Sequence, residues 1–200
     1  MNLGEHIGPA LRATLVTLGL TGVAYPLLAT GLSQSIFPHQ ANGSLVKNDS
    51  GQVVGSELIG QPFSSSAYFQ PRPSAAGDKG WDATSSGGSN LGPASKKLQE
   101  RATAEVLRLG KENPGAKGPI PAELVAASGS GLDPHLSPEA AGWQIERVAA
   151  ARRVSPERIR VVVQDAVEGR DLGFMGEPRV NVLLINLSLD RKFGKPVATR

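Results

Sequence analysis

Residues Leu11–Phe37 decide the organisation of the chain, and they read LRATLVTLGLTGVAYPLLATGLSQSIF. No Asp, Glu, Lys or Arg lies between Arg12 and Lys47. A helix needs about 20 mostly apolar residues to cross the hydrocarbon core of a bilayer, and residues 13–33 provide that length. Because hydrocarbon offers no water, each backbone N–H and C=O must be paired within the segment. The sequence therefore predicts one transmembrane helix.

A cleaved signal peptide is the alternative for this stretch. Arg12 would be its charged start and Ala29–Gly31 its small-residue cleavage site. The apolar run is longer than the usual signal-peptide core of about 7–15 residues, which favours a retained anchor. Pro26 removes one backbone donor and predicts a bend near Tyr25. The orientation is weakly signalled, since Glu5 offsets the positive charges at the amino-terminal end.

Small residues form a stripe along the predicted helix, at spacings of four, four and three: Ala13, Thr17, Thr21 and Ala24. Such stripes allow another helix to approach closely, whereas a helix that meets only lipid has no use for one. We therefore expect helix packing against a transmembrane partner. The alternative is that Thr and Ala are simply tolerated at these positions.

The composition excludes several classes of function. The chain has 200 residues, a net charge of +3 and no cysteine, so cysteine nucleophiles and thiolate metal sites are ruled out. Basic residues are spread out and adjoin one another in pairs at most, such as Lys96–Lys97 and Arg152–Arg153, and aromatic residues are few. Nucleic-acid surfaces normally need a concentrated basic stripe, so we expect no nucleic-acid partner. Residues 1–37 are expected to carry the anchor and residues 38–200 one soluble domain.

The first part of the soluble domain reads as a hairpin followed by a long loop. Short apolar pieces flank the turn residues Asn48–Gly51, and Glu57–Gly60 extends the second predicted strand. Residues 61–92 are rich in Ser, Gly and Pro. They also carry four aromatic residues, which disordered linkers lack: Phe63, Tyr68, Phe69 and Trp81. We therefore expect an ordered, irregular loop.

Helices dominate the second part. We expect one from Pro93 to Gly110, and two that begin with Ser-Pro-Glu at Ser137 and Ser155. The helix from Ser155, expected to end at Gly169, has a β-branched run that also allows a strand. Arg179–Asp190 alternates between apolar and polar residues, which predicts a strand with one buried face. The fold class expected is α+β, with one N-terminal transmembrane helix followed by a single small domain.

Candidate ligand sites are few, and each has a structural alternative. Gly87–Gly92 precedes a predicted helix, where anions can bind, but no Lys-Ser or Lys-Thr follows it, so a simple turn is favoured. Ser128, Gly129, Ser130 and Gly131 form a second small-residue loop. A hydrolase using Ser130 and His135 lacks a recognisable base and orienting group. Turn capping explains the acids beside Trp81 as well as acid–base chemistry does.

Gln144 lies at the edge of the predicted buried stripe of its helix. There its amide could contact a ligand, or it could be an ordinary boundary glutamine. No spacing of His, Asp and Glu predicts a metal site, and no set of residues predicts catalysis.

Several long motifs resemble those of the C subunit of the Kdp potassium-transporting ATPase, and they occur in the same order over essentially the whole chain. They are GSELIGQPF (55–63), YFQPRPS (68–74), SGGSNLGP (86–93), ASGSGLDPHLSP (127–138), Gln144 with RVA (147–149), and GFMGEPRVN (173–181).

The resemblance implies a single-pass, non-catalytic subunit of the bacterial inner membrane, with its domain on the extracytoplasmic side. The partners implied are a potassium channel-like subunit and a P-type ATPase subunit. The family is described as a catalytic chaperone that raises the ATP affinity of the pump subunit. Its nucleotide contact would fall here on Ser128, Gly129, Ser130, Gly131 and Gln144. ATP is cytoplasmic, so an extracytoplasmic domain could instead be a purely structural clamp that never contacts a nucleotide.

Overall fold

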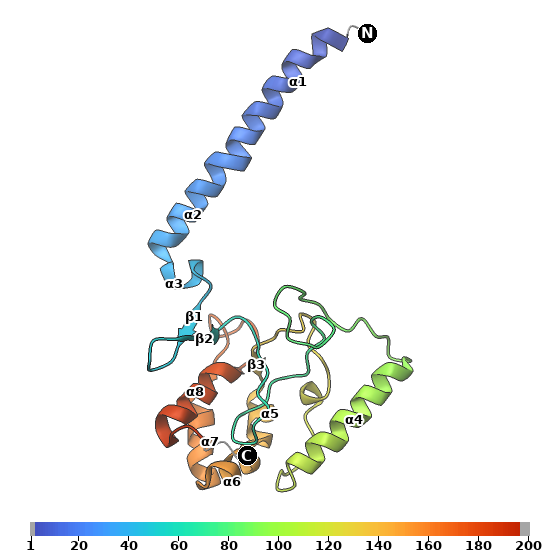
Figure 1. Ribbon diagram of the computed structural model, residues 1–200, viewed down its shortest axis with the longest axis vertical. Helices are drawn as coiled ribbons and strands as arrows, with labels where there is room; N and C mark the ends of the chain where they lie inside the picture. Colours follow the sequence, from blue (N-terminus) through green and yellow to red (C-terminus); the bar gives the residue numbers. More distant parts are fainter. Residues whose placement is uncertain (1–2, 197–200) are drawn as a thin grey trace. The chain divides into compact units, whose positions relative to one another are not determined.

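The structure is a computed structural model that describes residues 3–196 (Figure 1). The chain forms two compact units, one ending at Leu45 and the other beginning at Val46. The first unit is a long helical rod made of α1 (Leu3–Thr17), the π-helical stretch η1 (Leu18–Ala24) and α2 (Tyr25–Ile36), followed by the short helix α3 (Pro38–Ala41). His6–Ile36 has a mean hydropathy of 1.6, and its most apolar part is not buried. By length and composition this helix can cross a membrane, as predicted.

Pro26 perturbs the rod differently from the prediction. Figure 1 shows no sharp bend near Tyr25. Instead the helix widens to π geometry in η1, where the N–H of Tyr25 donates to the carbonyl of Leu20, five residues earlier. The proline ring removes the N–H that would donate to the carbonyl of Gly22, and a π turn is one way to absorb that loss.

The second unit contains short strands, one 3₁₀ turn and five α-helices within the described residues. Its elements are β1 (Leu45–Lys47, beginning at the unit boundary), β2 (Val53–Ser56), α4 (Lys96–Glu112), the 3₁₀ turn η2 (Ala122–Leu124), β3 (His135–Leu136), α5 (Pro138–Trp143), α6 (Ile145–Arg152), α7 (Pro156–Asp165), β4 (Val167–Glu168), β5 (Arg179–Asn181) and α8 (Val182–Phe193). The predicted α+β class is confirmed.

The strands form two small antiparallel arrangements. β1 and β2 make the predicted hairpin, although β2 ends at Ser56 and does not continue through Glu57–Gly60. β5 lies between β3 and β4, and Val180 pairs with both Leu136 and Val167. The core lies where helices α5–α8 pack around this sheet. Its most deeply buried side chains are Phe69, Leu136, Val148, Ile159, Ile185 and Leu189.

The predicted strand over Arg179–Asp190 is wrong beyond its first three residues. Asn181 caps a helix there, because its side-chain oxygen accepts from the N–H of Leu184 at 3.2 Å. Of the apolar residues that alternate along this stretch, Leu187 is only partly buried in the helix. The buried positions of α8 follow helical spacing: Val182, Leu183, Ile185, Asn186 and Leu189.

The other helices match the prediction with shifted ends. α4 begins after the cap Ser95 rather than at Pro93, and it continues through Gly110 to Glu112. The helix predicted from Pro138 is divided at Gln144 into α5 and α6, and its apolar face is buried over Ala141, Ile145, Val148 and Ala149. α7 begins at Pro156 as predicted, but it ends at Asp165 instead of Gly169.

The long segment 61–92 contains no helix or strand, as predicted, and yet it is tied into the core. Phe69 is completely buried in the cluster formed by the helices. The neighbours Ala67 and Gln70 are buried as well. An irregular stretch at this depth must find partners for its backbone groups, because unpaired buried N–H and C=O groups are costly.

A pair of leucine substitutions distinguishes helix from strand over residues 182–193. In α8 Leu189 is completely buried, whereas Leu187 is only partly buried. We expect Leu189→Ala to lower the free energy of unfolding by about 2–5 kcal/mol and Leu187→Ala by about 1 kcal/mol or less. Thermal unfolding of the full chain in detergent measures both. Equal losses would indicate a strand with both leucines on one buried face.

Candidate functional site

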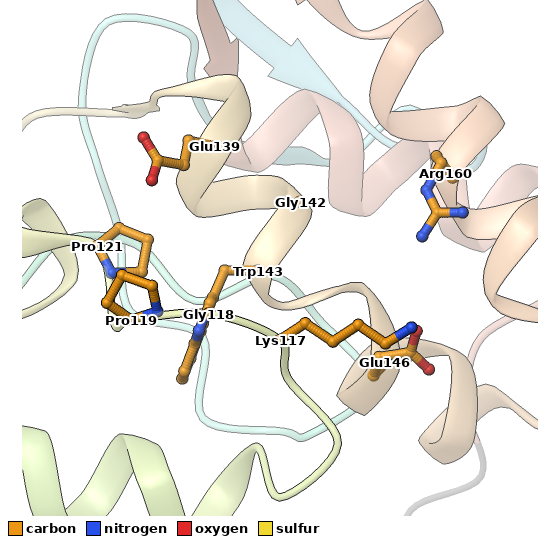
Figure 2. A pocket seen from close by; sticks show the side chains of 9 residues that line it. All are labelled: Lys117, Gly118, Pro119, Pro121, Glu139, Gly142, Trp143, Glu146 and Arg160. Carbon is orange, nitrogen blue, oxygen red and sulfur yellow. The ribbon is translucent and has the colours of Figure 1, made fainter.

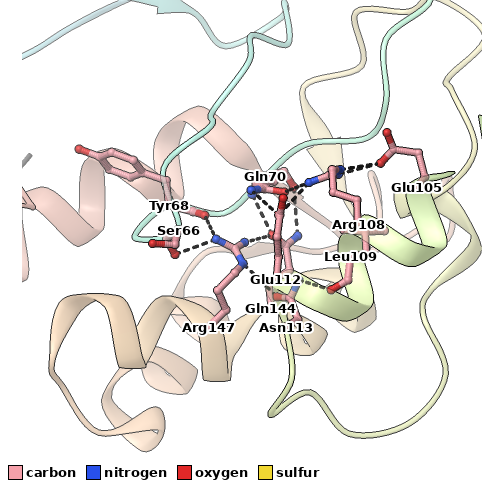
Figure 3. Close-up of polar contacts among 10 residues, drawn as sticks. All are labelled: Ser66, Tyr68, Gln70, Glu105, Arg108, Leu109, Glu112, Asn113, Gln144 and Arg147. Carbon is pink, nitrogen blue, oxygen red and sulfur yellow. Dashed lines mark hydrogen bonds and ion pairs between the residues drawn. The ribbon is translucent and has the colours of Figure 1, made fainter. Parts of the chain in front are cut away.

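Gln144 lies inside the domain, at the junction of α5 and α6, with 1% of its surface exposed. Its side-chain oxygen accepts from the backbone N–H of Gln70 at 2.8 Å, and its amide nitrogen donates to the carbonyl of Gln70 at 3.0 Å. The same nitrogen also donates to the carbonyl of Ala140 at 3.4 Å. Figure 3 shows Gln144 between Gln70 and Arg147. The side chain therefore pairs a backbone unit of the long loop, as a neighbouring strand would.

Arg147 holds the same loop from the next turn of α6. Its guanidinium donates to the carbonyls of Ser66 and Tyr68 at 2.7 and 2.9 Å, and to the oxygen of Gln144 at 2.5 Å. It also donates to the side chain of Asn113 at 2.9 Å. Burial lowers the pKa of Arg147 to about 10, although the charge of Glu112 opposes this. The group therefore stays protonated at neutral pH, and all these contacts are charge-assisted.

Two further groups complete this pairing. Asn186 of α8 accepts from the N–H of Phe69 at 2.8 Å and donates to its carbonyl at 2.9 Å. Arg152 donates to the carbonyl of Ala67 and to Asp190, both at 2.7 Å. We call residues 66–70, with the side chains that hold them, the buried clasp. Its side-chain members are Gln144, Arg147, Arg152 and Asn186.

Tyr68 closes the exposed end of the clasp. Its hydroxyl donates to Asp190 at 2.9 Å, and the guanidinium of Arg152 lies over its ring, 5.0 Å from the centroid. Burial raises the pKa of Tyr68, and the hydrogen bond to Asp190 acts in the same direction. The tyrosine is therefore neutral at physiological pH and acts as a donor to the carboxylate.

A cavity of about 440 Å³ borders the clasp on the side of α4. Arg108 spans part of its wall, and it donates to Gln70 at 2.9 Å, to Glu112 at 2.8 Å and to Glu105 at 2.7 Å. Figure 3 shows Arg108 between Glu105 on one side and Gln70 and Glu112 on the other. One arginine is paired here with two carboxylates, so these three residues together leave a net charge of −1 in this wall.

The loop Ser128–Gly131 occupies another part of the domain. The carbonyl of Ser130 accepts from the N–H of Gly87 at 2.8 Å, and the carbonyl of Gly131 accepts from Ser74 at 2.6 Å. Gly131 has a φ of 68°, and a Cβ there would lie 2.6 Å from the backbone of Ala76 and of Gly87, so only glycine fits. Ser128 is buried, whereas Gly129 and Ser130 are exposed.

The predicted nucleotide-binding residues thus fall into two groups. Within residues 3–196, no hydrogen bond joins Gln144 to the loop 128–131; Gln144 is bonded to Gln70, and the loop to Ser74 and Gly87. The hydroxyl of Ser130 is also used locally, because it accepts from the N–H of Leu132 at 3.1 Å. The loop over Gly87–Gly92 is the packing partner of 128–131 and leads to the cap of α4.

His135 does not form a catalytic pair with Ser130 in the described part of the chain. It lies in β3 rather than at a helix entry, and its ring is 3.7 Å from Asp133. Burial would raise the pKa of Asp133, but hydrogen bonds from His135 and the charge of Arg72 lower it. Asp82, beside Trp81, caps the N–H of Thr84 at 2.9 Å, which is the turn role considered for it. Among residues 3–196, no group of three or more His, Asp or Glu could hold a metal ion.

A second cavity, of about 280 Å³, is lined by Trp143 and by four charged side chains (Figure 2). Glu139 and Arg160 lie on opposite sides of the view, and Lys117 and Glu146 lie lower in it. The indole N–H of Trp143 is buried and has no acceptor in the described structure. Nothing in this arrangement forms a nucleophile with a base.

The predicted stripe on the apolar helix is exposed along its length, over Ala13, Thr17, Thr21 and Ala24. The hydroxyl of Thr17 donates to the carbonyl of Ala13, and that of Thr21 to the carbonyl of Thr17, both at 2.7 Å. Because the hydroxyls are bonded within the helix, the exposed surface of the stripe is formed by small, mostly apolar groups. Packing of a partner against it stays a prediction.

Sequence reasoning located Gln144 but did not find the residues that surround it. The hydrogen bonds of the clasp join residues that lie 38 to 117 positions apart in the sequence. They involve Gln70, Asn186 and Arg152. No local spacing marks such contacts. The only available signal was that polar residues stood on otherwise apolar helix faces.

Comparison with known proteins gives one consistent family. Residues 7–191 match the family described as K+-transporting ATPase, c chain. The potassium-transporting ATPase KdpC subunit of Myxococcus xanthus is 63% identical over 185 residues, which cover 92% of this chain and 87% of the relative. The proteins of the same name from Sorangium cellulosum and Rhodospirillum rubrum are 53% and 52% identical, covering 92% of this chain and 97% and 95% of theirs.

Replacing Gln144 should damage the fold rather than a surface contact. Gln144→Leu leaves the buried N–H and C=O of Gln70 without partners, at about 1–3 kcal/mol for each group. We expect a loss of about 2–6 kcal/mol in the free energy of unfolding, measured by thermal unfolding of the full chain. Gln164→Leu, at an exposed position of α7, is the matched control and should change little. Similar stability of the two variants would contradict the clasp.

Proposed function

The chain belongs to the family of the K+-transporting ATPase c chain, and we propose that it helps to assemble the potassium-transporting ATPase in the bacterial inner membrane. As a member of this family it is an accessory subunit of that complex. The proposed partners are the potassium channel-like subunit and the P-type ATPase subunit. The observation that carries the proposal is the combination of one apolar helix with a domain in which the buried side chains of Gln144 and Arg147 are bonded internally.

We propose that the subunit makes and breaks no bonds itself. Ser130 and His135 are not paired, and the acidic and basic side chains beside Trp143 form no nucleophile–base set. A hydrolytic site needs a nucleophile within hydrogen-bond reach of an oriented base. The role as a catalytic chaperone, which raises the ATP affinity of the pump subunit, would then act through contact between subunits.

Direct contact with ATP has less support from the geometry. The oxygen and nitrogen of the Gln144 side chain are already bonded, so a nucleotide could use them only by releasing Gln70 and Arg147. Gly129 and Ser130 are exposed and could meet a ligand, but they lie in a loop that is not bonded to Gln144. A structural clamp without any nucleotide contact is therefore the second candidate.

We further propose that the domain lies on the extracytoplasmic side. This placement rests on the resemblance. The positive-inside rule gives little indication of orientation here, because the charge of Arg12 is offset by that of Glu5. In that position the domain would be separated from cytoplasmic ATP by the bilayer. Any effect on ATP affinity would then have to travel through the partner subunits.

The stripe on the anchor can be tested by enlarging it. In the complete complex, Thr17→Leu with Thr21→Leu should reduce the amount of this subunit that co-purifies in detergent several-fold, since larger side chains hold a neighbouring helix away. Thr30→Leu makes the same chemical change off the stripe and should leave co-purification unchanged. Equal recovery of all three proteins would contradict packing through Ala13, Thr17, Thr21 and Ala24.

The orientation can be tested by labelling, because the natural chain has no cysteine. Ala104→Cys places a thiol on the exposed face of α4, and His6→Cys places one at the other end of the anchor. In sealed right-side-out vesicles, a membrane-impermeant maleimide should label Cys introduced at position 104 and not that at position 6. The reverse pattern would place the domain beside ATP and restore direct nucleotide contact.

A further inference from the structure

Three large apolar side chains stand in solvent on the turn between β4 and β5. Leu172 is 82% exposed, Phe174 71% and Met175 51%. We call Asp171–Met175 the apolar turn. Single exposed apolar residues are normal on protein surfaces, but three within four positions form a patch. Neither the clasp nor the loop 128–131 uses them.

The apolar turn has a defined shape. The N–H of Asp171 donates to the carbonyl of Met175, and the N–H of Met175 to the carbonyl of Asp171, both at 2.9 Å. At its base Arg179 pairs with Asp171 and with Glu168, at 3.1 and 3.0 Å. The turn therefore presents its apolar side chains from a closed, hydrogen-bonded backbone. Because this backbone is already ordered, little conformational entropy is lost when the turn binds a partner.

Leu172 carries a second cost besides exposure. Its φ of 54° lies in the left-handed region, which bulky side chains rarely adopt. The strained backbone turns a leucine toward water, and the hydrogen bonds between Asp171 and Met175 hold it in that conformation. Strain of this kind persists where function requires it.

We propose that the apolar turn inserts into an apolar cleft on the extramembrane surface of another subunit of the same membrane complex, with Leu172 and Phe174 as its anchors. This inference rests on the proposed function, because it names the surface through which the subunit would contact its partner. The turn is a small, preformed protrusion, and the partner provides the concave binding surface.

The area of the apolar patch favours a subunit of the same complex as its partner over a second copy of the chain in solution. Large side chains bury roughly 150–250 Å² each, so three partly exposed ones offer about 400 Å². A stable interface between free proteins buries about 800 Å² on each partner. The apolar turn is therefore too small to hold a dimer by itself. It suffices for a partner that the anchor already keeps nearby, since tethering raises the effective concentration.

The charges around the turn select a protein over a lipid surface. Arg170 is paired with Glu177 at 2.8 Å, and Arg179 with its two carboxylates. Binding to anionic membranes normally uses unpaired Lys or Arg beside the apolar residues. Here two arginines face three carboxylates, so headgroup attraction is absent and the apolar side chains carry the contact.

A photo-crosslink tests which surface the turn meets. The photoreactive analogue p-benzoylphenylalanine, incorporated at position 174 of the chain in the intact membrane complex, should crosslink to another pump subunit on illumination. The same analogue at position 107, an equally exposed leucine on α4, is the control for random contact. Products with lipid, with a second copy of this chain, or equal products from both positions would overturn the proposal.

A matched pair of variants tests the energetic role. Leu172→Ser with Phe174→Ser should reduce co-purification with the pump about tenfold in detergent, with the unfolding temperature unchanged. Leu58→Ser with Leu107→Ser removes comparable exposed apolar surface elsewhere and should have no effect. Unchanged recovery of the first variant would overturn this inference alone. Failure of the natural chain to co-purify would instead overturn the proposed function.

Discussion

The extramembrane domain depends on one constraint: the backbone of residues 66–70 is buried where no strand can pair with it. Phe69 must be inside the core, and its flanking peptide groups go with it. Asn186 and Gln144 each present an oxygen and an N–H to one residue of this segment, which is the pattern of donors and acceptors that a strand would present. Arg147 and Arg152 take the remaining carbonyls with charged donors. Side chains from α6, α8 and the α5–α6 junction thus replace a missing sheet.

This constraint changes how Gln144 should be interpreted. The resemblance groups Gln144 with the loop 128–131 as a nucleotide contact, but its amide here completes the pairing of the buried backbone of Gln70. Removing it leaves polar groups unsatisfied in a region of low dielectric, where the cost exceeds the value of the bond itself. A change in ATP affinity after mutation of Gln144 would therefore follow from a loosened domain as readily as from a lost contact. Gly129 and Ser130 are cleaner probes of nucleotide binding, because both are exposed.

Local patterns predicted the parts of the fold that local physics determines. The apolar helix follows from length and hydropathy, the start of α7 from Ser155-Pro156, and the β1–β2 hairpin from its turn residues. α8 was predicted as a strand because apolar residues alternate with polar ones near its C-terminal end, and a period of two indicates a strand. The feature that indicates a helix instead is the cap Asn181, which accepts from the N–H of Leu184. The buried clasp could not be predicted from the sequence, for a different reason. Gln144 and Gln70 are 74 positions apart, and nothing near either residue signals the other.

The division into anchor and domain also limits how strong the domain's own contacts need to be. Two proteins that meet from solution must offset the loss of free translation and rotation, and this demands a large interface. A domain attached to a membrane helix has lost much of that freedom already. Shape then matters more than area, and a stiff feature serves better than a wide one. The buried clasp supplies stiffness inside the domain, while the paired charges around Arg179 supply it at the surface. In both the clasp and the ion pairs around Arg179, polar side chains hold the backbone in place. This is consistent with a subunit that works by presenting a fixed surface to its neighbours.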